Sequence, residues 1–412
     1  MSVLLISTYM SLSSWGSEQL RSHLSSFSSQ AGQHDAKLSA SGAHRVPAKT
    51  FMDGLHTLED VRKYAHVGFD GNLYPPTFYP AEVNKLPRAR AAFLVLARNS
   101  DADDLRETMR AVEDRFNRKF GYPWIFLNNE PFDDDFKNEI KRWTRAKVEF
   151  GVIPKEHWSY PDHIDQVHAA AQREMLEEND VIYGGSESYR HMCRFNSGFF
   201  YDHPLTQNLD YYWRVEPETR LYCDIDYDPF LFMYLNNKKY GFTITIQEFE
   251  ETIPTLWPKT RDFIADHPEY IAKDDARWFI TDDGPDGSFD QDYNLCHFWS
   301  NFEIADLNFF RGKAYRDYFE FLDKDGGFFY ERWGDAPVHS IAASLFLNRS
   351  ELHHFEDIGY FHPGATHCPA NKRLFHDTGK CLCKPDESDD LDEYLCMRQW
   401  WRTSIEGEPK RD

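Results

Sequence analysis

The run Ala91-Ala-Phe-Leu-Val-Leu-Ala97 is continuously apolar, with no alternation of apolar and polar residues. This pattern is typical of a strand buried on both faces, as in a parallel sheet. Apolar residues then recur at helical spacing over 101–120, followed by an apolar run at 123–129, a second helical segment at 133–144 and a third apolar run at 147–153. Strands alternating with helices predict an α/β fold built on a parallel sheet.

Residues that follow such strands are candidates for ligand contacts, because ligands of open α/β sheets bind at the carboxyl ends of the strands. Arg98 and Asn99 directly follow the first predicted strand. Capping of a surface turn explains the position of Arg98 equally well. Neither GxGxxG nor GxxxxGK[ST] occurs, so the common dinucleotide-binding and ATP-binding loops are absent from the sequence.

A second stretch concentrates negative charge in apolar surroundings. Tyr211-Tyr-Trp-Arg-Val-Glu-Pro-Glu-Thr-Arg-Leu-Tyr-Cys-Asp-Ile-Asp-Tyr-Asp228 places five carboxylates among aromatic and β-branched residues. Burying an ionised carboxylate is costly unless it is paired, hydrogen-bonded or coordinated to a metal. The stretch therefore predicts a cation site, and oxygen ligands favour Mg²⁺, Mn²⁺ or Ca²⁺ over Zn²⁺.

Four more segments mix polar and aromatic residues, at 183–198, 293–305, 326–339 and 352–368. The first contains turn glycines, hydroxyls and two arginines, a composition that suits a phosphate-and-sugar pocket and equally suits a surface loop. The third brings Asp335 and His339 together ahead of an apolar helix expected over 340–346. The last contains four histidines, which favours a polar site.

The chain is strongly acidic, with 68 Asp and Glu against 46 Lys and Arg and a formal net charge of −22. Nucleic-acid binding needs clustered positive charge, so we exclude a nucleic-acid partner. A phosphate-containing ligand would need a metal ion and a few arginines to supply the positive charge.

Four of the seven cysteines lie in the last part of the chain, in a segment with little apolar sequence. Disulfides would hold this tail in place and would indicate an oxidising compartment. A zinc site formed by Cys368, Cys381, Cys383 and His376 is the alternative. We favour disulfides, because Cys-x-Cys without a second paired motif is weak evidence for zinc.

The amino-terminal part differs in composition from the rest. Residues 13–50 are rich in Ser, Gln, His, Gly and Ala, so we expect 1–87 to be a stem or linker that is partly disordered. We expect the folded domain over 88–412, including the cysteine-containing tail. The apolar segment 1–12 is shorter than the roughly 20 residues that a membrane-spanning helix needs, so no anchor is evident.

Five long motifs, in order, resemble the fungal KTR family of α-1,2-mannosyltransferases, glycosyltransferase family 15. They are Ser-Tyr-Arg-His-Met-Cys-Arg-Phe-Asn-Ser-Gly-Phe-Phe at 188–200, Tyr-Tyr-Trp-Arg-Val-Glu-Pro at 211–217 with Cys-Asp-Ile-Asp-Tyr-Asp at 223–228, Asn-Leu-Cys-His-Phe-Trp-Ser-Asn-Phe-Glu-Ile at 294–304, Phe-Tyr-Glu-Arg-Trp-Gly-Asp-Ala-Pro-Val-His at 329–339, and Phe-Glu-Asp-Ile-Gly-Tyr-Phe-His-Pro at 355–363. The resemblance covers about residues 88–400.

The resemblance implies a GT-A-type glycosyltransferase fold with a Rossmann-like, mixed and mainly parallel sheet. It also implies GDP-mannose as donor, Mn²⁺ as cofactor, and transfer with retention to a mannoside on O- or N-glycans of a glycoprotein. Members of the family are type II membrane proteins of the Golgi lumen. A catalytically silent carbohydrate-binding protein of the same fold is the alternative, because a fold alone does not guarantee activity.

The resemblance further implies that Glu216 and His362 are the Mn²⁺ ligands. A carboxylate with an imidazole suits Mn²⁺ better than Ca²⁺. The alternative is that Asp224-Ile-Asp226 serves as the Asp-x-Asp motif common among sugar-nucleotide enzymes. We favour Glu216 and assign Asp224 to the donor site.

The remaining roles also come from the resemblance. Glu303 matches the candidate nucleophile, or the carboxylate that stabilises an oxocarbenium-like centre, and the sequence does not separate double displacement from front-side attack. Tyr189 and Asp335 match positions near the acceptor hydroxyl. The expected donor or phosphate contacts are Arg98, Arg194, His297 and Asn301.

Overall fold

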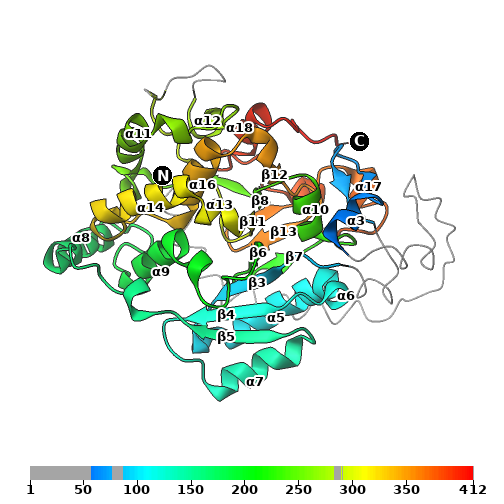
Figure 1. Ribbon diagram of the computed structural model, residues 1–412, viewed down its shortest axis with the longest axis horizontal. Coiled ribbons are helices and arrows are strands. Elements are labelled where there is room, and N and C mark those ends of the chain that lie inside the picture. The colour runs from blue at the N-terminus through cyan, green and yellow to red at the C-terminus, as the bar shows by residue number, and fades with distance from the viewer. Residues whose placement is uncertain (1–56, 77–86, 283–288, 290, 412) are drawn as a thin grey trace. The chain divides into compact units, whose positions relative to one another are not determined.

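The computed structural model describes residues 57–76, 87–282, 289 and 291–411, and these lie in one compact unit that covers Arg45–Asp412. The largest sheet of the described part has seven strands in the order β12-β8-β11-β6-β3-β4-β5 (Figure 1). Their bounds are β3 Ala91–Leu96, β4 Trp124–Asn128, β5 Val148–Val152, β6 Tyr211–Arg214, β8 Tyr240–Phe242, β11 Glu303–Asp306 and β12 Leu352–His354.

The sheet is mixed and mainly parallel, which confirms the predicted fold class. β3, β4, β5 and β6 run parallel to one another, and β12 runs parallel to β8. β11 is antiparallel to both of its neighbours, β6 and β8. The predicted order of strands and helices over 91–153 is confirmed by α5 (Ala102–Val112), α6 (Arg118–Phe120) and α7 (Asp134–Trp143), where a π-helical turn joins α5 to α6.

The central strands are buried on both faces, because alternate residues of β3 enter two different apolar cores. Ala92 and Leu94 pack on the side of α9 (Glu187–Gly198), α14 (Lys313–Asp325) and α16 (Asp335–Phe346). Phe93 and Val95 pack on the side of α5, α7 and α10 (Pro229–Leu235). Figure 1 shows α9 and α14 together on the left, and α5, α6 and α7 in the lower part. Full burial of a Leu, Phe or Val side chain contributes about 1.5–3 kcal/mol.

Two segments differ from the prediction. Residues 187–198, expected as a pocket-forming or surface loop, form helix α9, whose amino terminus is capped by Ser186 through a hydrogen bond from the Tyr189 amide. The helix expected over 340–346 begins earlier, at Asp335. Pro337 lies in its first turn, where the missing amide hydrogen costs no hydrogen bond.

The other α-helices and strands of the described part are as follows. The helices are α3 Leu58–Arg62, α8 Gln166–Glu178, α11 Leu256–Asp266, α12 Arg277–Ile280, α13 Leu307–Arg311, α15 Gly327–Tyr330, α17 Lys372–Phe375 and α18 Met397–Thr403. The strands are β1 His66–Val67, β2 Leu73–Tyr74, β7 Arg220–Leu221, β9 Thr245–Gln247, β10 Cys296–Phe298, β13 Tyr360–His362 and β14 Ala365–His367. β14, β13 and β7 form a small antiparallel sheet.

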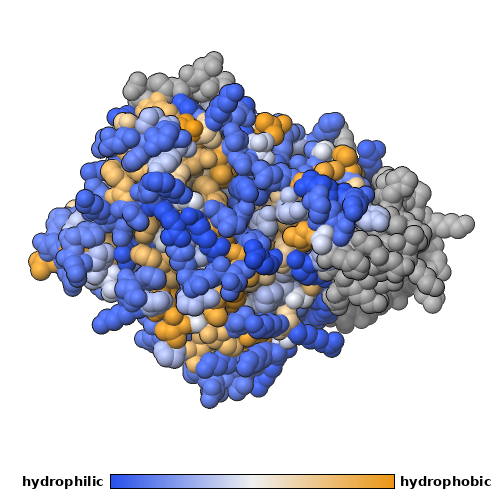
Figure 2. Space-filling view, in the orientation of Figure 1, coloured by the Kyte–Doolittle hydropathy of each residue, from blue (hydrophilic) through white to orange (hydrophobic). Residues whose placement is uncertain are grey.

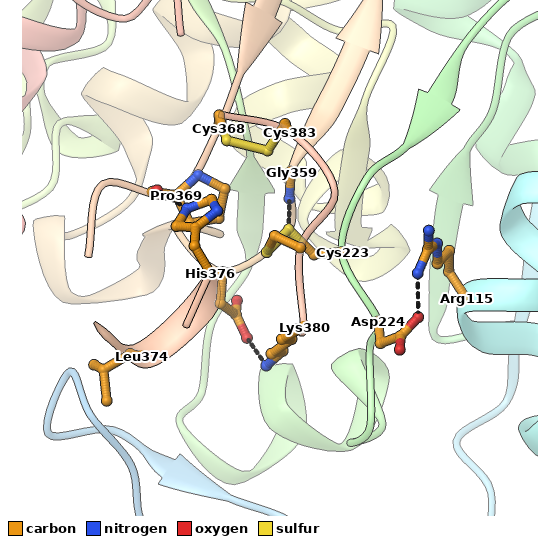
Figure 3. The surroundings of a disulfide bond; sticks show 12 residues. Arg115, Cys223, Asp224, Gly359, Cys368, Pro369, Leu374, His376, Lys380 and Cys383 are labelled. Atoms are coloured by element: carbon orange, nitrogen blue, oxygen red, sulfur yellow. Dashed lines mark hydrogen bonds and ion pairs between the residues drawn. A yellow bond between two sulfur atoms is a disulfide. The ribbon is translucent and has the colours of Figure 1, made fainter. Parts of the chain in front are cut away.

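The carboxyl-terminal tail is held by disulfides, as predicted. The bonds join Cys223 to Cys381, Cys296 to Cys396, and Cys368 to Cys383, while Cys193 is free and buried. The alternative zinc site is wrong, because its three cysteines are oxidised and His376 Nε2 lies 2.8 Å from the carbonyl oxygen of Pro369. Figure 3 shows Cys368–Cys383 beside Cys223 and Gly359.

The described amino-terminal residues contact the main body. Leu73 donates its amide hydrogen to Asn236 Oδ1 at 2.8 Å, and the Tyr74 ring lies against Tyr227 and Phe232. The remaining residues of the expected linker, including the apolar segment 1–12, lie outside the described residues. No helix within the described ranges is both long and apolar enough to span a membrane. The face drawn in Figure 2 is mostly hydrophilic, with small separate apolar patches, in keeping with the high charge content.

Candidate functional site

Several of the predicted site residues lie at one edge of the central sheet. Glu216 follows the carboxyl end of β6, and Arg98 follows the carboxyl end of the parallel strand β3. Ser300 and Asn301 precede β11, which is antiparallel to β6, so its amino end lies at the same edge. This is the edge at which open α/β sheets bind their ligands.

Glu216 and His362 face each other across a short gap. His362 Nε2 lies 3.6 Å from Glu216 Oε2, and the two side chains are 21% and 29% exposed. A hydrogen bond from His362 Nδ1 to the carbonyl oxygen of Pro363, at 3.0 Å, orients the ring so that Nε2 faces Glu216. The pair offers one oxygen and one nitrogen donor with access to solvent.

Two local features set these orientations. The chain turns sharply after Glu216, at Pro217 and Glu218, whose φ of 61° is uncommon outside glycine, and the Thr219 hydroxyl donates to the Glu216 carbonyl oxygen at 2.8 Å. His362 ends β13, and its ring lies edge-on to Trp299 with centroids 4.5 Å apart.

Arg214 links Glu216 to Asp335. Its Nε donates to Glu216 Oε1 at 2.9 Å, and its Nη1 donates to both Asp335 Oδ2 and, at 3.2 Å, Ser300 Oγ. Burial raises the pKa of Glu216, but Arg214 and His362 outweigh it and bring the pKa to about 2. Glu216 is therefore ionised at neutral pH, with Oε1 held by Arg214 and Oε2 directed toward His362.

Glu303 is completely buried between the sheet and α16. Its Oε2 accepts a hydrogen bond from Tyr240 at 2.5 Å and lies 2.9 Å from His339 Nδ1, whereas its Oε1 has no hydrogen-bond partner among the described residues. Burial raises the pKa of Glu303, and the Glu303 carboxylate in turn raises the pKa of His339 against the effect of burial. Glu303 and His339 thus form a buried pair in direct contact, and His339 Nε2 lies 2.9 Å from the Asn196 carbonyl oxygen.

Helix α16 connects the two carboxylate systems. Asp335 and His339 lie one turn apart on it; Asp335 contacts Arg214 and His339 contacts Glu303. Glu303 is also paired directly with Arg214 in the register of β11 and β6. A small cavity beside them is lined by Leu94, Leu96, Leu127, Phe195, Asn196, Phe200, Tyr212, Arg214 and His339.

Tyr189 lies near this assembly, in the first turn of α9. Its ring stacks on Tyr183 with centroids 4.6 Å apart, and the Arg332 guanidinium lies 5.2 Å above it. Burial raises the pKa of Tyr189, and the negative charges of Glu248 and Asp335 add to this effect.

Two residues that were predicted to contact the sugar-nucleotide donor form ion pairs elsewhere in the structure. Asp224 is half exposed and forms an ion pair with Arg115 at 2.5 Å, beside the Cys223–Cys381 disulfide (Figure 3). Arg194 is buried and forms a two-pronged ion pair with Asp323, at 2.6 and 2.9 Å. The structure does not bring either side chain to the Glu216 group.

The other three predicted donor contacts differ in exposure. Arg98 is largely exposed and pairs with Asp101 at 3.1 Å, as the surface-turn alternative predicts. His297 is buried, with its Nδ1 3.3 Å from the Leu295 carbonyl oxygen, and burial lowers its pKa. Asn301 is buried, and neither polar atom of its amide has a partner within the described part of the chain.

Sequence reasoning missed Arg214, Ser300 and Tyr240 as parts of the site, and it named His339 beside Asp335 without giving it a role. Two signals were available: Arg214 and Glu216 are two residues apart at a strand end, and Asp335 and His339 have the spacing of one helical turn. Tyr240 and Ser300 carried no such signal.

Comparison with known proteins identifies the family. The sequence model of the family described as glycolipid 2-alpha-mannosyltransferase matches residues 70–405. The chain belongs to this family. It is 54% identical over 314 residues to glycolipid 2-alpha-mannosyltransferase 1 of Candida albicans, covering 76% of this chain and 72% of the relative. It is 53% identical over 341 residues to an alpha-1,2 mannosyltransferase of Saccharomyces cerevisiae, covering 82% of this chain and 85% of the relative.

Solved structures of mannosyltransferases have the same fold. The Mn/GDP form of core-mannan synthase A from Aspergillus fumigatus matches with a TM-score of 0.72 and 42% identity, covering 78% of this chain and 87% of that one. A mannosyltransferase of Saccharomyces cerevisiae in complex with GDP matches with a TM-score of 0.75 and 35% identity, covering 90% of this chain and 98% of that one. The expected GT-A-type mannosyltransferase fold is therefore confirmed.

Proposed function

We propose that the chain is a Mn²⁺-dependent mannosyltransferase that moves mannose from GDP-mannose to a hydroxyl of a mannoside, with retention, to form an α-1,2 linkage. The observation that carries the proposal is the pair Glu216 and His362, whose Oε2 and Nε2 face each other at 3.6 Å at the ligand-binding edge of the sheet. Family membership and the likeness to mannosyltransferase structures support the assignment.

The donor set fits Mn²⁺. One carboxylate oxygen and one imidazole nitrogen suit this ion, and two protein ligands leave positions for diphosphate oxygens and water. When bound, the ion offsets the negative charge that builds on the departing diphosphate. Arg214 fixes Glu216 through Oε1, so that Oε2 stays directed at the metal position.

We assign Glu303, Asp335 and Tyr189 to the reacting sugar and acceptor. Glu303 presents a free Oε1 while Tyr240 and His339 hold Oε2, which suits a group that supplies negative charge to an oxocarbenium-like centre. Asp335, held by Arg214 and Ser300, accepts a hydrogen bond from the attacking hydroxyl, and Tyr189 positions the acceptor from α9.

Among the donor contacts, we favour Asn301. Buried polar groups are almost always hydrogen-bonded, so the two unpaired atoms of its amide indicate a ligand partner. Arg98 is largely exposed and lies at the same edge of the sheet as Glu216, and we propose that it contacts a phosphate of the donor. We propose that Arg194, His297 and Asp224 act by holding neighbouring elements.

We propose a secretory location, in the Golgi lumen, with glycoprotein glycans as acceptors. The three disulfides support it, because such bonds persist in oxidising compartments. Protease protection in sealed microsomes tests the location; digestion of the folded domain without detergent would rule it out.

Mannose transfer from GDP-mannose to methyl α-mannoside tests the activity. We expect transfer with Mn²⁺, loss of transfer with EDTA, and an α-1,2-linked product by NMR. Transfer that is indifferent to EDTA would overturn the metal assignment, and binding of the mannoside with no transfer under any metal would favour the silent carbohydrate-binding protein.

A further inference from the structure

A second group of side chains of the types that bind metals lies between β12, β14 and the tail. His354 ends β12, His367 ends β14, and Glu356 lies in the segment between these strands. One donor atom of each lies within 4.8 Å of the others. All three residues are at least nine-tenths buried, Glu356 being 8% exposed.

The outer atom of each side chain already has a partner. His354 Nε2 donates to the Thr243 carbonyl oxygen at 2.9 Å, and His367 Nδ1 donates to Asp390 at 2.9 Å. Glu356 Oε1 accepts the Ala370 amide hydrogen at 2.7 Å. Such outer contacts fix the tautomer and orientation of metal ligands, and a carboxylate behind a histidine is typical of zinc sites.

The inner atoms converge without bonding to one another. Glu356 Oε2 lies 3.7 Å from His354 Nδ1 and 3.9 Å from His367 Nε2. These distances exceed those of hydrogen bonds, and Oε2 has no hydrogen-bond partner in the ranges that the structure describes. A carboxylate oxygen buried in this way is costly unless a cation is close to it; in this structure His367, which donates from both ring nitrogens, supplies that charge at 3.9 Å, and a metal ion would take its place.

A nearby pair shows what direct bonding looks like. His353, next to His354 on β12, lies with Nδ1 2.9 Å from Glu406 Oε1, and Lys238 contacts the same oxygen at 3.2 Å. In that pair a direct hydrogen bond joins His353 to Glu406, and the Lys238 ammonium group contacts the same carboxylate oxygen. The wider spacing around Glu356 instead leaves room for an ion between the donor atoms.

We propose that His354, Glu356 and His367 form a structural metal site that takes a divalent transition metal, zinc above others. Zn²⁺ binds two histidines and a glutamate at about 2.0–2.2 Å, which sets ligand atoms roughly 3.4 Å apart in a tetrahedron. The two glutamate–histidine spacings require an inward shift of a few tenths of an ångström, and closing the whole set, whose donor atoms lie within 4.8 Å of one another, requires a shift of up to about 1.4 Å. His367 Nε2, now 3.1 Å from the Glu356 carbonyl oxygen, gives up its proton to solvent when the ion binds.

The site would brace the strand that carries His362. β14 pairs with β13 through His362 and Ala365, and His362 is the last residue of β13. A metal joining β12 to β14 would hold this hairpin against the central sheet. This consequence rests on the proposed role of His362, whereas the metal site itself does not.

Metal analysis of the purified full chain tests the proposal. We expect about one zinc per chain by inductively coupled plasma mass spectrometry, in wild type and equally in Glu216→Gln, which lacks the proposed Mn²⁺ ligand. Glu356→Gln should lose this zinc. His376→Gln, which changes a histidine of the same tail whose Nε2 contacts the Pro369 carbonyl oxygen, should keep it.

Wild-type protein stripped with dipicolinate and titrated with Co²⁺ gives a second measurement that needs no substitution at the site. We expect the intense visible absorption of tetrahedral Co²⁺, reversed by Zn²⁺, and a higher melting temperature with either ion. Equal zinc in wild type and folded Glu356→Gln would overturn the proposal. So would the absence of zinc from wild type together with no Co²⁺ band, which would show that protons alone fill the cluster.

Discussion

Two of the glutamate–histidine contacts in the described part of the chain, Glu216 with His362 and Glu356 with His367, lie in the proposed metal sites, and they differ in solvent access. Glu216 and His362 are 29% and 21% exposed, whereas the side chains of Glu356 and His367 are 10% and 0% exposed. We propose that similar donor atoms serve two purposes. An ion that must meet a new substrate in each turnover needs open coordination positions, while a closed site holds an ion for structure.

The pKa values of the two glutamates also differ, because their charged neighbours differ. Arg214 contacts Glu216 and lowers its pKa to about 2 against the effect of burial. Burial raises the pKa of Glu356 to about 7, only partly offset by His367. Glu216 is therefore charged whether or not a metal is bound, while the charge on Glu356 depends on what fills the cluster.

The largest effect on activity is expected when the more exposed of the two carboxylates, that of Glu216, is removed. Glu216→Gln should lower kcat/KM for mannose transfer by about 1,000-fold or more, because the metal position loses its only anionic protein ligand. The fold should persist, since Gln preserves the shape of the side chain. Glu218→Gln is the matched control: this exposed glutamate is two residues away, its backbone rather than its side chain forms the turn, and the variant should retain activity. Equal losses in both variants would contradict the assignment.

The second largest effect concerns Glu303. Glu303→Gln should lower kcat by about 100-fold to 1,000-fold with a small change in KM, because negative charge at the reacting sugar is lost. Tyr240→Phe, which removes one hydrogen bond to Glu303 and leaves its carboxylate, should cost only about 10-fold by the same reasoning. Near-normal kcat in Glu303→Gln would assign this carboxylate to holding His339 in place.

The sequence predicts more of the fold than of the site, for a physical reason. Runs such as 91–97 signal buried strands through local composition alone, and the structure confirms the strand order around them. The helix at 187–198 escaped prediction because it buries polar residues. Arg190, for example, is fully buried and donates to the carbonyl oxygens of Ser186 and Glu331.

The site depends on contacts between residues far apart in the chain, which local pattern does not encode. Composition pointed to the carboxylates of 211–228, and only the family resemblance selected Glu216 and His362. Neither source revealed that Arg214 bridges Glu216 to Asp335. The pairing of Cys223 with Cys381 was likewise out of reach, because seven cysteines allow many pairings.

The pair His353 and Glu406, which are joined by a direct hydrogen bond, offers a third case for comparison, because it should affect the stability of the fold in acid. Burial raises the pKa of Glu406, but His353 and Lys238 outweigh it and lower the pKa to about 2. Because the folded pKa lies below the unfolded value, the pair stabilises the fold fully above about pH 4.5 and loses this effect as the pH falls toward about 2. Glu406→Gln should cost about 1–3 kcal/mol at pH 7 and flatten that acid limb in denaturant unfolding. Glu408→Gln, on an exposed neighbour, should change neither; an unchanged limb in Glu406→Gln would contradict the account.

The smallest effect is expected at the competing carboxylate. Asp224 is half exposed and paired with Arg115, so Asp224→Asn should change kcat/KM by no more than about 3-fold. Steady-state kinetics with GDP-mannose measures this. A loss as large as that of Glu216→Gln would instead assign the metal to the Asp224-Ile-Asp226 motif.

Calorimetric titration of GDP, with and without Mn²⁺, tests the central claim most directly, because it measures the metal site without catalysis. Wild type and Asp224→Asn should bind GDP at least about 10-fold more tightly with Mn²⁺ than without it, whereas Glu216→Gln and His362→Gln should lose this dependence. Normal Mn²⁺-dependent binding in folded Glu216→Gln, with loss in Asp224→Asn, would contradict the assignment of the ion to Glu216 and His362.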